Sequence, residues 1–212
     1  MPKAKWIDIS IGLKSNTVCW PGNPKVMVKS ISSIAEGKIY NASVLSLCVH
    51  SGTHMDAPRH LIKNGPSIDR LPIEAVVGPA RVINITDRVS IKPQELKKHR
   101  LQKGERILFK TVSSGLWKKP GFIEHYVYIT SEAAKYIVSA GVITMGVDYL
   151  SVGSFKDGVA THKILLQNGI WIIEGLNLLN IKPGDYDLIC LPIKIMNSDG
   201  AMARAVIRPR KT

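Results

Sequence analysis

Cysteine is scarce in this sequence, and its spacing excludes two common kinds of site. The three cysteines, Cys19, Cys48 and Cys190, lie far apart, and none belongs to a C-x-x-C pair of the kind that zinc ribbons and thiol redox sites use. An odd and scattered set also excludes a disulfide framework and is typical of free thiols in a reducing compartment. We expect Cys48 to pack in the hydrophobic core.

A long uncharged apolar run is also missing. No stretch of about 18 apolar residues without a charge occurs, so we expect no membrane-spanning helix and no membrane partner. Residues 1–6 lack the apolar core of a signal peptide, and we expect a cytoplasmic protein. Internal repeats and Ser- or Gly-rich linkers are absent, so we expect residues 1–212 to form a single domain.

Acidic and aromatic residues are few. The chain has 29 Lys and Arg against 16 Asp and Glu, which gives a formal net charge of +13, and 6% of its residues are aromatic. Such a charge is common in nucleic-acid binders, whose binding depends steeply on salt. The basic residues are spread along the chain, however, and no motif interleaves them with aromatic residues for base stacking. We therefore predict a solvated basic surface and no nucleic-acid partner, with attraction of anionic substrates as an alternative.

Histidine is also scarce, and half of it lies in one short stretch. The sequence has six histidines, and His50, His54 and His60 lie within eleven residues that also contain Asp56. The apolar residues 43–49 before this stretch predict a strand. If the chain stays extended through residue 56, the side chains of His50, His54 and Asp56 lie on the same face.

This arrangement predicts a metal site. Two imidazole nitrogens and one carboxylate suit zinc, manganese or ferrous iron, and spacing alone does not choose among them. Pro58 should end the strand, which places His60 just beyond the metal-facing residues as a candidate acid or base. The alternatives are hydrogen-bonded core histidines or a polar loop. The helical zinc motif His-Glu-x-x-His is absent.

The rest of the sequence alternates between strand and helix patterns, which is typical of an α/β fold. The clearest helix pattern covers residues 130–141, with a Thr cap at its start and Gly at its end. A shorter helix is expected at 91–99 and another at 161–169. Strands are expected at 6–13, 26–33, 79–85, 106–111, 142–147, 170–176, 186–195 and 201–208.

Three further residues are candidates for a functional site. Glu174 lies near the end of an apolar strand, where a carboxylate is costly to bury unless it is paired or binds a cation. His162, in the predicted helix 161–169, could face the same site, although a surface position on that helix is the alternative. Trp20 lies in a Pro- and Gly-containing turn, and it either packs on the core or presents its ring to a ligand.

The residues from His50 to His60 read H-S-G-T-H-M-D-A-P-R-H. This stretch closely resembles the H-x-G-T-H-x-D-x-P-x-H signature of the cyclase-like metal-dependent hydrolases, the family of bacterial kynurenine formamidase and isatin hydrolase. The similarity covers nearly the whole chain, because weaker family motifs follow in family order: Asp8-Ile9-Ser10, Trp20-Pro21-Gly22, Leu71-Pro72, Gly146-Val147-Asp148, Glu174-Gly175-Leu176 and Pro183-Gly184-Asp185-Tyr186.

The resemblance implies a swivelling β/β/α-type fold, with a central mixed or barrel-like sheet and flanking helices, assembled as homodimers or larger homo-oligomers. It implies that His60 is the general acid/base and that Trp20 lines the substrate pocket. The metal ligands that it implies are His50, His54 and Asp56 for a first ion, and Asp56, His162 and Glu174 for a second ion.

The implied activity is hydrolysis of an amide-type C–N bond in a small molecule, as in the arylformamidase step of tryptophan catabolism, with Zn²⁺, or alternatively Mn²⁺, as one or two bound ions. The alternatives are hydrolysis of a cyclic amide or lactone, as in isatin hydrolase, and metal binding without turnover. Two departures concern pocket loops and leave the substrate open. Asn23 stands where Asp is common in the family, and Met202 stands where Pro is usual.

Overall fold

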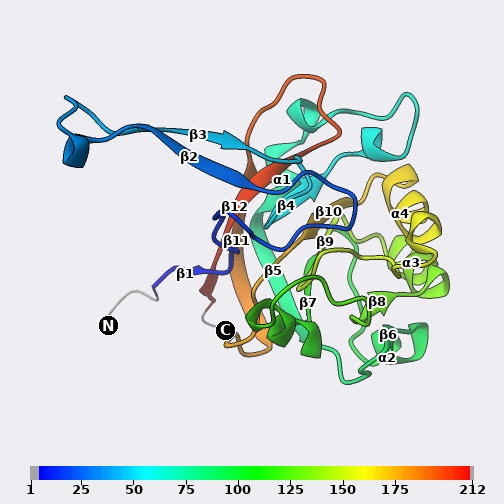
Figure 1. Cartoon of the computed structure of the whole chain (residues 1–212). Helices are drawn as coiled ribbons and strands as arrows, with labels where there is room; N and C mark the ends of the chain where they lie inside the picture. The colour runs from blue at the N-terminus through cyan, green and yellow to red at the C-terminus, as the bar shows by residue number, and fades with distance from the viewer. Residues whose placement is uncertain (1–4, 211–212) are drawn as a thin grey trace.

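The computed structural model describes residues 5–210 and is built on a sheet that closes on itself. The predicted single domain also includes residues 1–4 and 211–212, which lie outside the described range. The sheet has eight strands, and an additional pairing between β12 and β4 closes seven of them into a ring, with β1 added at the edge (Figure 1). In spatial order the strands are β1 (Ile7–Asp8), β12 (Gly200–Pro209), β11 (Gly184–Pro192), β5 (Val77–Asn84), β7 (Arg106–Lys110), β9 (Thr144–Val147), β10 (Trp171–Glu174) and β4 (His54–Asp56).

The sheet is mixed. Strands β5, β7, β9 and β10 run parallel to one another, whereas β4, β11 and β12 make antiparallel pairs. Two small sheets lie outside the ring, and they pair β2 (Met27–Ser32) with β3 (Ala42–Ser46) and β6 (Ser90–Ile91) with β8 (Tyr128–Ile129). The prediction of an α/β fold with a central mixed, barrel-like sheet and flanking helices is confirmed.

The helices are short, and α2, α3 and α4 lie together on one side of the ring, at the right of Figure 1. Their bounds are α1 (Ile73–Val76), α2 (Pro93–Lys97), α3 (Ser131–Ser139) and α4 (Gly158–Gln167), with 3₁₀ turns η1 (Ile34–Glu36), η2 (Pro58–His60), η3 (Ile68–Arg70) and η4 (Val112–Lys118). The predicted cap of α3 is present, because the Thr130 hydroxyl accepts a hydrogen bond from the Ala133 N–H. Within residues 5–210, no helix is long and apolar enough to cross a membrane.

Alternating side chains on the strands build two separate cores. On β7, Leu108 packs with the apolar side chains of the first core, whereas Ile107 and Phe109 pack with residues of α3 and α4 in the second. On β10, Ile173 belongs to the first core and Ile172 to the second. Because successive residues of a strand point to opposite faces, the second core lies between the sheet and the helices.

The predicted strand through residues 43–57 is wrong in its middle. Strand β3 ends at Ser46 and β4 begins at His54, and the residues between them form a loop. The chain turns at Gly52, whose φ of 63° is in the left-handed region that glycine adopts without a steric penalty. Thr53 anchors the loop, because its hydroxyl donates to the Gly175 carbonyl and accepts from the Ile11 N–H.

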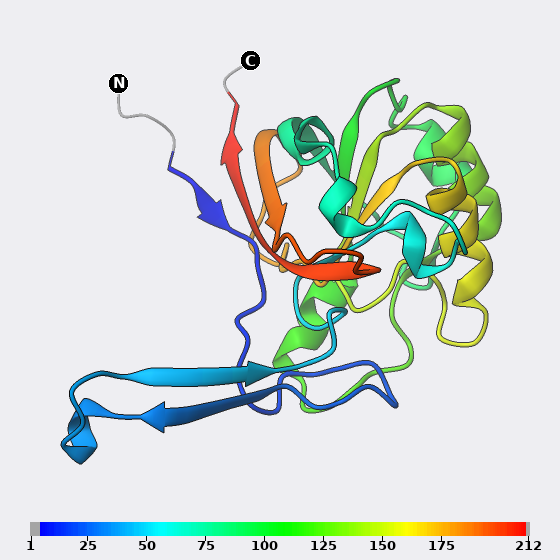
Figure 2. The same ribbon diagram turned by 90° about the horizontal axis from the view of Figure 1, so that it is seen from above.

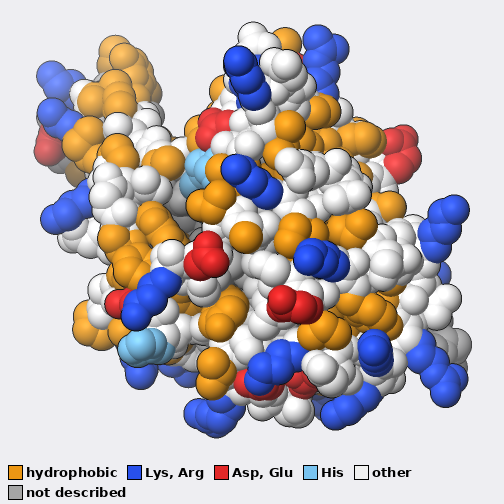
Figure 3. Space-filling model, turned by 90° about the vertical axis from the view of Figure 1, so that its right-hand side faces the viewer, with side chains coloured by type: hydrophobic (Ala, Val, Ile, Leu, Met, Phe, Trp, Pro, Cys, Tyr) orange, Lys and Arg blue, Asp and Glu red, His pale blue; other side chains and the backbone are white. Residues whose placement is uncertain are grey.

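Strands β2 and β3 form an arm that projects away from the ring (Figures 1 and 2). Almost every residue of the two strands is exposed. The exposed side chains include many large apolar ones, which gather on the arm at the upper left of Figure 3. The exposed hydrophobic residues of this arm are Met27, Val28, Ile31, Ile34, Ile39, Tyr40, Val44 and Leu45.

The contact between Gly175 and the Gly52 loop gives a stability prediction. Gly175 has a φ of 73°, and a Cβ at this position would lie 2.0 Å from the Gly52 carbonyl oxygen. Gly169 has a nearly equal φ of 72°, but a Cβ there would meet nothing within 4 Å. We expect Gly169→Ala to lower the free energy of unfolding by about 1–2 kcal/mol, because alanine is strained at this backbone conformation. Gly175→Ala should lower it by about 1–3 kcal/mol more, because its Cβ also overpacks the Gly52 loop. Chemical denaturation of both variants measures the difference, and equal losses would contradict this account.

Candidate metal centre

Strands β4 and β10 place three polar side chains on the helix side of the sheet. Met55 of β4 points into the first core, so His54 and Asp56 on either side of it point the other way. The antiparallel register sets His54 directly opposite Glu174 on β10, and residues opposite each other share a face. All three side chains are buried. The local pattern of β4 therefore gives the shared face that the sequence predicted for His54 and Asp56.

Two more histidines reach this group from outside the sheet. His162 of α4 has its Nε2 atom 3.1 Å from Glu174 Oε1 and 3.7 Å from Asp56 Oδ2. His50 comes from the loop before β4, and its Nδ1 atom is 2.8 Å from Asp56 Oδ1. The structure therefore brings together all five residues predicted as metal ligands, although His50 does so from a loop and not from a continuous strand.

Backbone carbonyls fix the ring nitrogens of two of these histidines. The Nδ1 atom of His54 is 3.0 Å from the Gly52 carbonyl oxygen, and that of His162 is 2.8 Å from the Gly158 carbonyl oxygen. A carbonyl can only accept, so both Nδ1 atoms carry the proton. In each ring the nitrogen that a cation can reach is therefore Nε2, which faces the carboxylates, as in metal sites where an outer hydrogen bond sets the imidazole tautomer.

The cluster contains buried polar atoms that lack a partner. Within the part of the chain that the structure describes, these atoms include His54 Nε2 and Asp56 Oδ2. His54 Nε2 lies 3.3 Å from the nearest oxygen of Glu174, but the two atoms do not form a hydrogen bond. Leaving such atoms unsatisfied costs about 1–3 kcal/mol each. A cation among them would satisfy both, so the residues present fit a bound divalent metal.

The ligand atoms form two overlapping triads. Each triad has its potential donor atoms within 4.8 Å of one another, and Asp56 belongs to both. One triad consists of His50, His54 and Asp56, and the other consists of Asp56, His162 and Glu174. A shared carboxylate suits a pair of neighbouring ions.

The two buried carboxylates make the cluster strongly attractive to positive charge. Burial raises the pKa of Asp56, but the neighbouring imidazoles bring it well below its usual range. Burial lowers the pKa of His54 and of His162, but the negative charges of the nearby Asp56 and Glu174 carboxylates raise both to about 9. Burial likewise lowers the pKa of His50, whereas Asp56 and Asp199 raise it to about 11. Without a metal ion, the site holds protons in its place.

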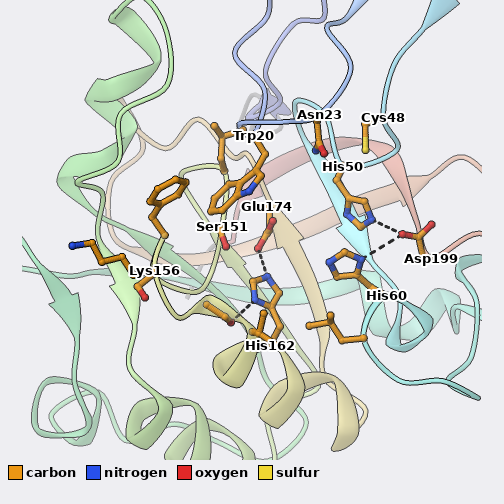
Figure 4. Close-up of a pocket in the computed structure, with 16 residues that line it drawn as sticks. Trp20, Asn23, Cys48, His50, His60, Ser151, Lys156, His162, Glu174 and Asp199 are labelled. Atoms are coloured by element: carbon orange, nitrogen blue, oxygen red, sulfur yellow. Dashed lines mark hydrogen bonds and ion pairs between the residues drawn. The ribbon is translucent and has the colours of Figure 1, made fainter.

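His60 lies beside the cluster on η2, two residues after the Pro58 that ends the extended segment, as predicted. Its ring is half-buried and lies 4.2 Å from that of His50, measured between centroids. The Nδ1 atom is 3.4 Å from Asp199 Oδ2, which is also 2.8 Å from His50 Nε2 (Figure 4). Sequence reasoning missed Asp199, because the Asn-Ser-Asp-Gly stretch around it is typical of a turn.

A cavity of about 480 Å³ opens onto the cluster. His50, His60 and Asp199 lie on one side of it, and Trp20 and Lys156 lie on the other (Figure 4). Cys48 also lines the cavity and is only partly buried, so the prediction that it packs in the core is wrong. The strand that would have buried it ends at Ser46.

Trp20 and Phe155 form an aromatic wall on the far side of the cavity, and Phe122 packs against both rings. The Trp20 ring lies 5.4 Å from that of Phe122 and 5.3 Å from that of Phe155, between centroids. Trp20 thus combines the two roles left open by the sequence, because it packs on other side chains and also lines the cavity. Such a wall suits a flat aromatic ligand, since offset and edge-to-face ring contacts are favourable.

Buried Asp148 anchors the 3₁₀ turn η4, whose Trp117 packs in the same aromatic cluster as Trp20. Its carboxylate accepts hydrogen bonds from the backbone N–H and hydroxyl groups of Thr111 and Ser114. Its backbone carbonyl accepts a hydrogen bond from the Trp117 ring. Burial raises the pKa of the Asp148 carboxyl, although these hydrogen bonds oppose the shift. The 3₁₀ turn η4 and the aromatic residues next to it are thereby fixed to the end of β9.

The donor set and the adjoining open cavity are those of a catalytic metal site, and similar proteins show its class, a metal-dependent hydrolase. A model of the Cyclase family, described as "Putative cyclase", matches residues 7–154. "Kynurenine formamidase" of Bacillus cereus is 36% identical over 210 residues, which cover 99% of this chain and 100% of that protein, and the Bacillus anthracis protein of the same name is also 36% identical. The chain therefore belongs to the Cyclase family.

Solved structures agree with this assignment. A "predicted metal-dependent hydrolase" from Bacillus stearothermophilus superposes with a TM-score of 0.86 at 26% identity, covering 99% of this chain and 100% of that one. Isatin hydrolase A from Labrenzia aggregata superposes with a TM-score of 0.83 at 23% identity, covering 98% of this chain and 94% of that one. The superposition on isatin hydrolase A shows that the two proteins share a fold.

The raised pKa values predict that metal binding releases protons. At about pH 7 the imidazoles of His50, His54 and His162 are protonated in the metal-free cluster, and a metal ligand must be deprotonated. We expect titration with zinc at this pH to release about two or more protons per chain. Since fewer protons remain at higher pH, the apparent affinity should rise from about pH 6 to pH 9.

Calorimetric titration in buffers of different ionisation enthalpy counts these protons. The exposed His125 lies outside the cluster, so the His125→Ala variant should release the same number as the unchanged protein. Zinc binding without proton release would show that the imidazoles are neutral before the metal arrives.

Proposed function

We propose that this protein hydrolyses an N-formyl aryl amide of the N-formylkynurenine type. The observation that carries the proposal is His60 beside two overlapping metal triads, at the edge of a cavity with an aromatic wall. The substrate class is taken from the relatives named kynurenine formamidase, which align along their full length. The cavity wall of Trp20 and Phe155, against which Phe122 packs, offers contacts for an aryl ring.

The five clustered residues are proposed to hold one or two zinc ions, with manganese as the alternative. Three imidazole nitrogens and two carboxylates match the ligand preferences of zinc, and manganese accepts the same ligand types. The first ion would be held by His50, His54 and Asp56, and the second by Asp56, His162 and Glu174. When bound, such an ion supplies Lewis acidity, which polarises a carbonyl group and makes a water molecule more acidic.

His60 is proposed as the general acid/base. Its ring lines the cavity next to the cluster, where it can take a proton from the attacking water as the new C–O bond forms. It then returns this proton to the leaving nitrogen as the C–N bond breaks, which yields formate and the free aryl amine. An imidazole suits both transfers, because the same ring nitrogen can accept a proton and give it up again.

The cavity also weighs against a purely structural metal site. Structural zinc sites are closed by four protein ligands, whereas catalytic sites leave a position open. Here the cavity is lined by His50, His162 and Glu174 themselves, so a small molecule reaches the cluster directly. Cyclic amides of the isatin type remain the alternative substrates, because the same acid/base chemistry opens them.

Replacing His60 separates metal binding from turnover. We expect His60→Ala to retain bound zinc but to lower kcat for N-formylkynurenine by about 10²–10⁴-fold, since that is the usual cost of removing a general acid/base. Steady-state kinetics and elemental analysis of the same sample give both quantities. The His99→Ala variant, altered outside the cavity, should keep full activity. A wild-type kcat in the His60→Ala variant would show that His60 is not the general acid/base.

We also propose that the chain forms a homodimer through the β2–β3 arm. A two-stranded hairpin is at best marginally stable alone in water, and this arm carries many exposed apolar side chains, with Ile39 94% exposed and Tyr40 62% exposed. Apolar surface of this kind marks an interaction site. A second copy supports the arm most simply, because a twofold axis buries the same surface on both chains.

An arm substitution tests this interface. Ile31 is 60% exposed on the arm and Val89 is 63% exposed elsewhere. We expect Ile31→Asp to shift the protein toward monomers, since each copy loses about 1.5–3 kcal/mol of apolar burial, whereas Val89→Asp leaves the assembly unchanged. Sedimentation velocity over a range of concentrations distinguishes the states. The proposed interface would be refuted if the wild-type protein were a monomer or if the Ile31→Asp variant were still a dimer.

A further inference from the structure

Asp199 lies in the loop that leads from β11 into β12, and this loop is anchored on both sides of the acid. The Asp199 carbonyl accepts a hydrogen bond from the Ala57 N–H, directly after β4, and the Ser198 carbonyl accepts one from the Ile68 N–H. The Asn197 N–H donates to the carboxylate of Asp69. These contacts fix the backbone of Asp199 relative to β4 and η2, which carry His54, Asp56 and His60.

The Asp199 carboxylate joins two histidines of different proposed roles. A single oxygen, Oδ2, lies 2.8 Å from His50 Nε2 and 3.4 Å from His60 Nδ1 (Figure 4). The two rings are close neighbours, with centroids 4.2 Å apart. One Asp199 oxygen therefore contacts both rings at the nitrogens that face it, Nε2 of His50 and Nδ1 of His60.

An ionised carboxylate can only accept hydrogen bonds, so its position selects the tautomer of each ring. In the metal-free site His50 donates from both nitrogens, Nδ1 to Asp56 Oδ1 and Nε2 to Asp199 Oδ2, each over 2.8 Å. When a metal ion replaces the Nδ1 proton, Asp199 keeps the other proton on Nε2, so Nδ1 is the ligand atom. His60 must carry its proton on Nδ1, which leaves Nε2 as its basic nitrogen. Each histidine is thus held in the form that its proposed role requires, His50 as a metal ligand and His60 as a base.

We propose that Asp199 is a positioning residue that sets the tautomer and orientation of His50 and His60 together. Outer carboxylates of this kind orient metal-binding histidines and typically contribute about 10–100-fold to metal affinity or activity. Asp199 couples the metal ligand to the acid/base, because one oxygen holds both rings. The kinetic part of this inference rests on the proposed hydrolase function, whereas the tautomer and the metal content do not.

The rival role for the same side chain is direct metal binding. His50, His60 and Asp199 also have potential donor atoms within 4.8 Å of one another. A ligand and a positioning residue differ in a measurable way, because removing a ligand lowers the number of bound ions and removing a positioning residue lowers only their affinity.

The test uses zinc-loaded full-length protein, because zinc is diamagnetic and permits NMR of the imidazole nitrogens. We expect ¹⁵N spectra of the unchanged protein to show His60 with its proton on Nδ1, and those of Asp199→Ala to show a mixture of tautomers. Asp199→Asn keeps an oxygen acceptor and should restore the single tautomer. Asp185→Asn removes the carboxylate of an exposed side chain on β11 and should change nothing.

The same variants are measured for metal and for turnover. For Asp199→Ala we expect the full number of ions at saturating zinc, an affinity about 10–100-fold weaker, and a kcat about 10–100-fold lower with KM within about twofold. Asp199→Asn should recover part of the lost kcat, which a general loss of folding would not allow.

Three outcomes would overturn the inference. One is an unchanged His60 tautomer in Asp199→Ala, the second is a kcat equal to that of the unchanged protein, and the third is the loss of an ion at saturating zinc, which would make Asp199 a ligand. If the unchanged protein does not hydrolyse the formamide, the proposed substrate fails, and the spectra and ion counts still decide the role of Asp199.

Discussion

Two carboxylates buried side by side are the constraint on which the rest of this site depends. Asp56 and Glu174 are both almost fully buried and contact the same pair of imidazoles, those of His54 and His162. Buried negative charges are tolerated when they are paired or bind a cation. The surrounding groups favour a bound cation. Backbone carbonyls orient the rings of His54 and His162 so that Nε2 faces the carboxylates, and unpartnered polar atoms lie at the centre of the cluster.

The sequence predicted the parts of the site that depend on local geometry. His54 and Asp56 lie two residues apart on a short strand, so alternation alone puts them on one face. His60 follows a proline that ends the strand, so its place at the edge of the site was also predictable. His162 and Glu174 needed more information, because the packing of α4 and the register of β10 against β4 bring them together. The resemblance to a known family supplied them.

The parts that the sequence did not predict depend on turns and on distant pairing. The loop from Leu47 to Thr53 follows from the left-handed Gly52 and from contacts with Gly175, which an apolar run of strand-forming residues conceals. Asp199 lies 149 positions from His50 in the sequence. The two meet because β12 pairs with β4, and no local pattern reports that pairing.

The closure of the ring by β12 has a consequence for how the protein is made. Strand β4 carries His54 and Asp56 but pairs with β10 and β12, which come from the second half and the very end of the chain. A nascent chain that has left the ribosome only as far as β10 has all five clustered residues, but β4 still has an open edge and the Asp199 loop is missing. Contacts between segments so far apart in sequence form slowly. Metal loading is therefore expected to follow the pairing of β12 with β4, although all five clustered residues lie earlier in the chain.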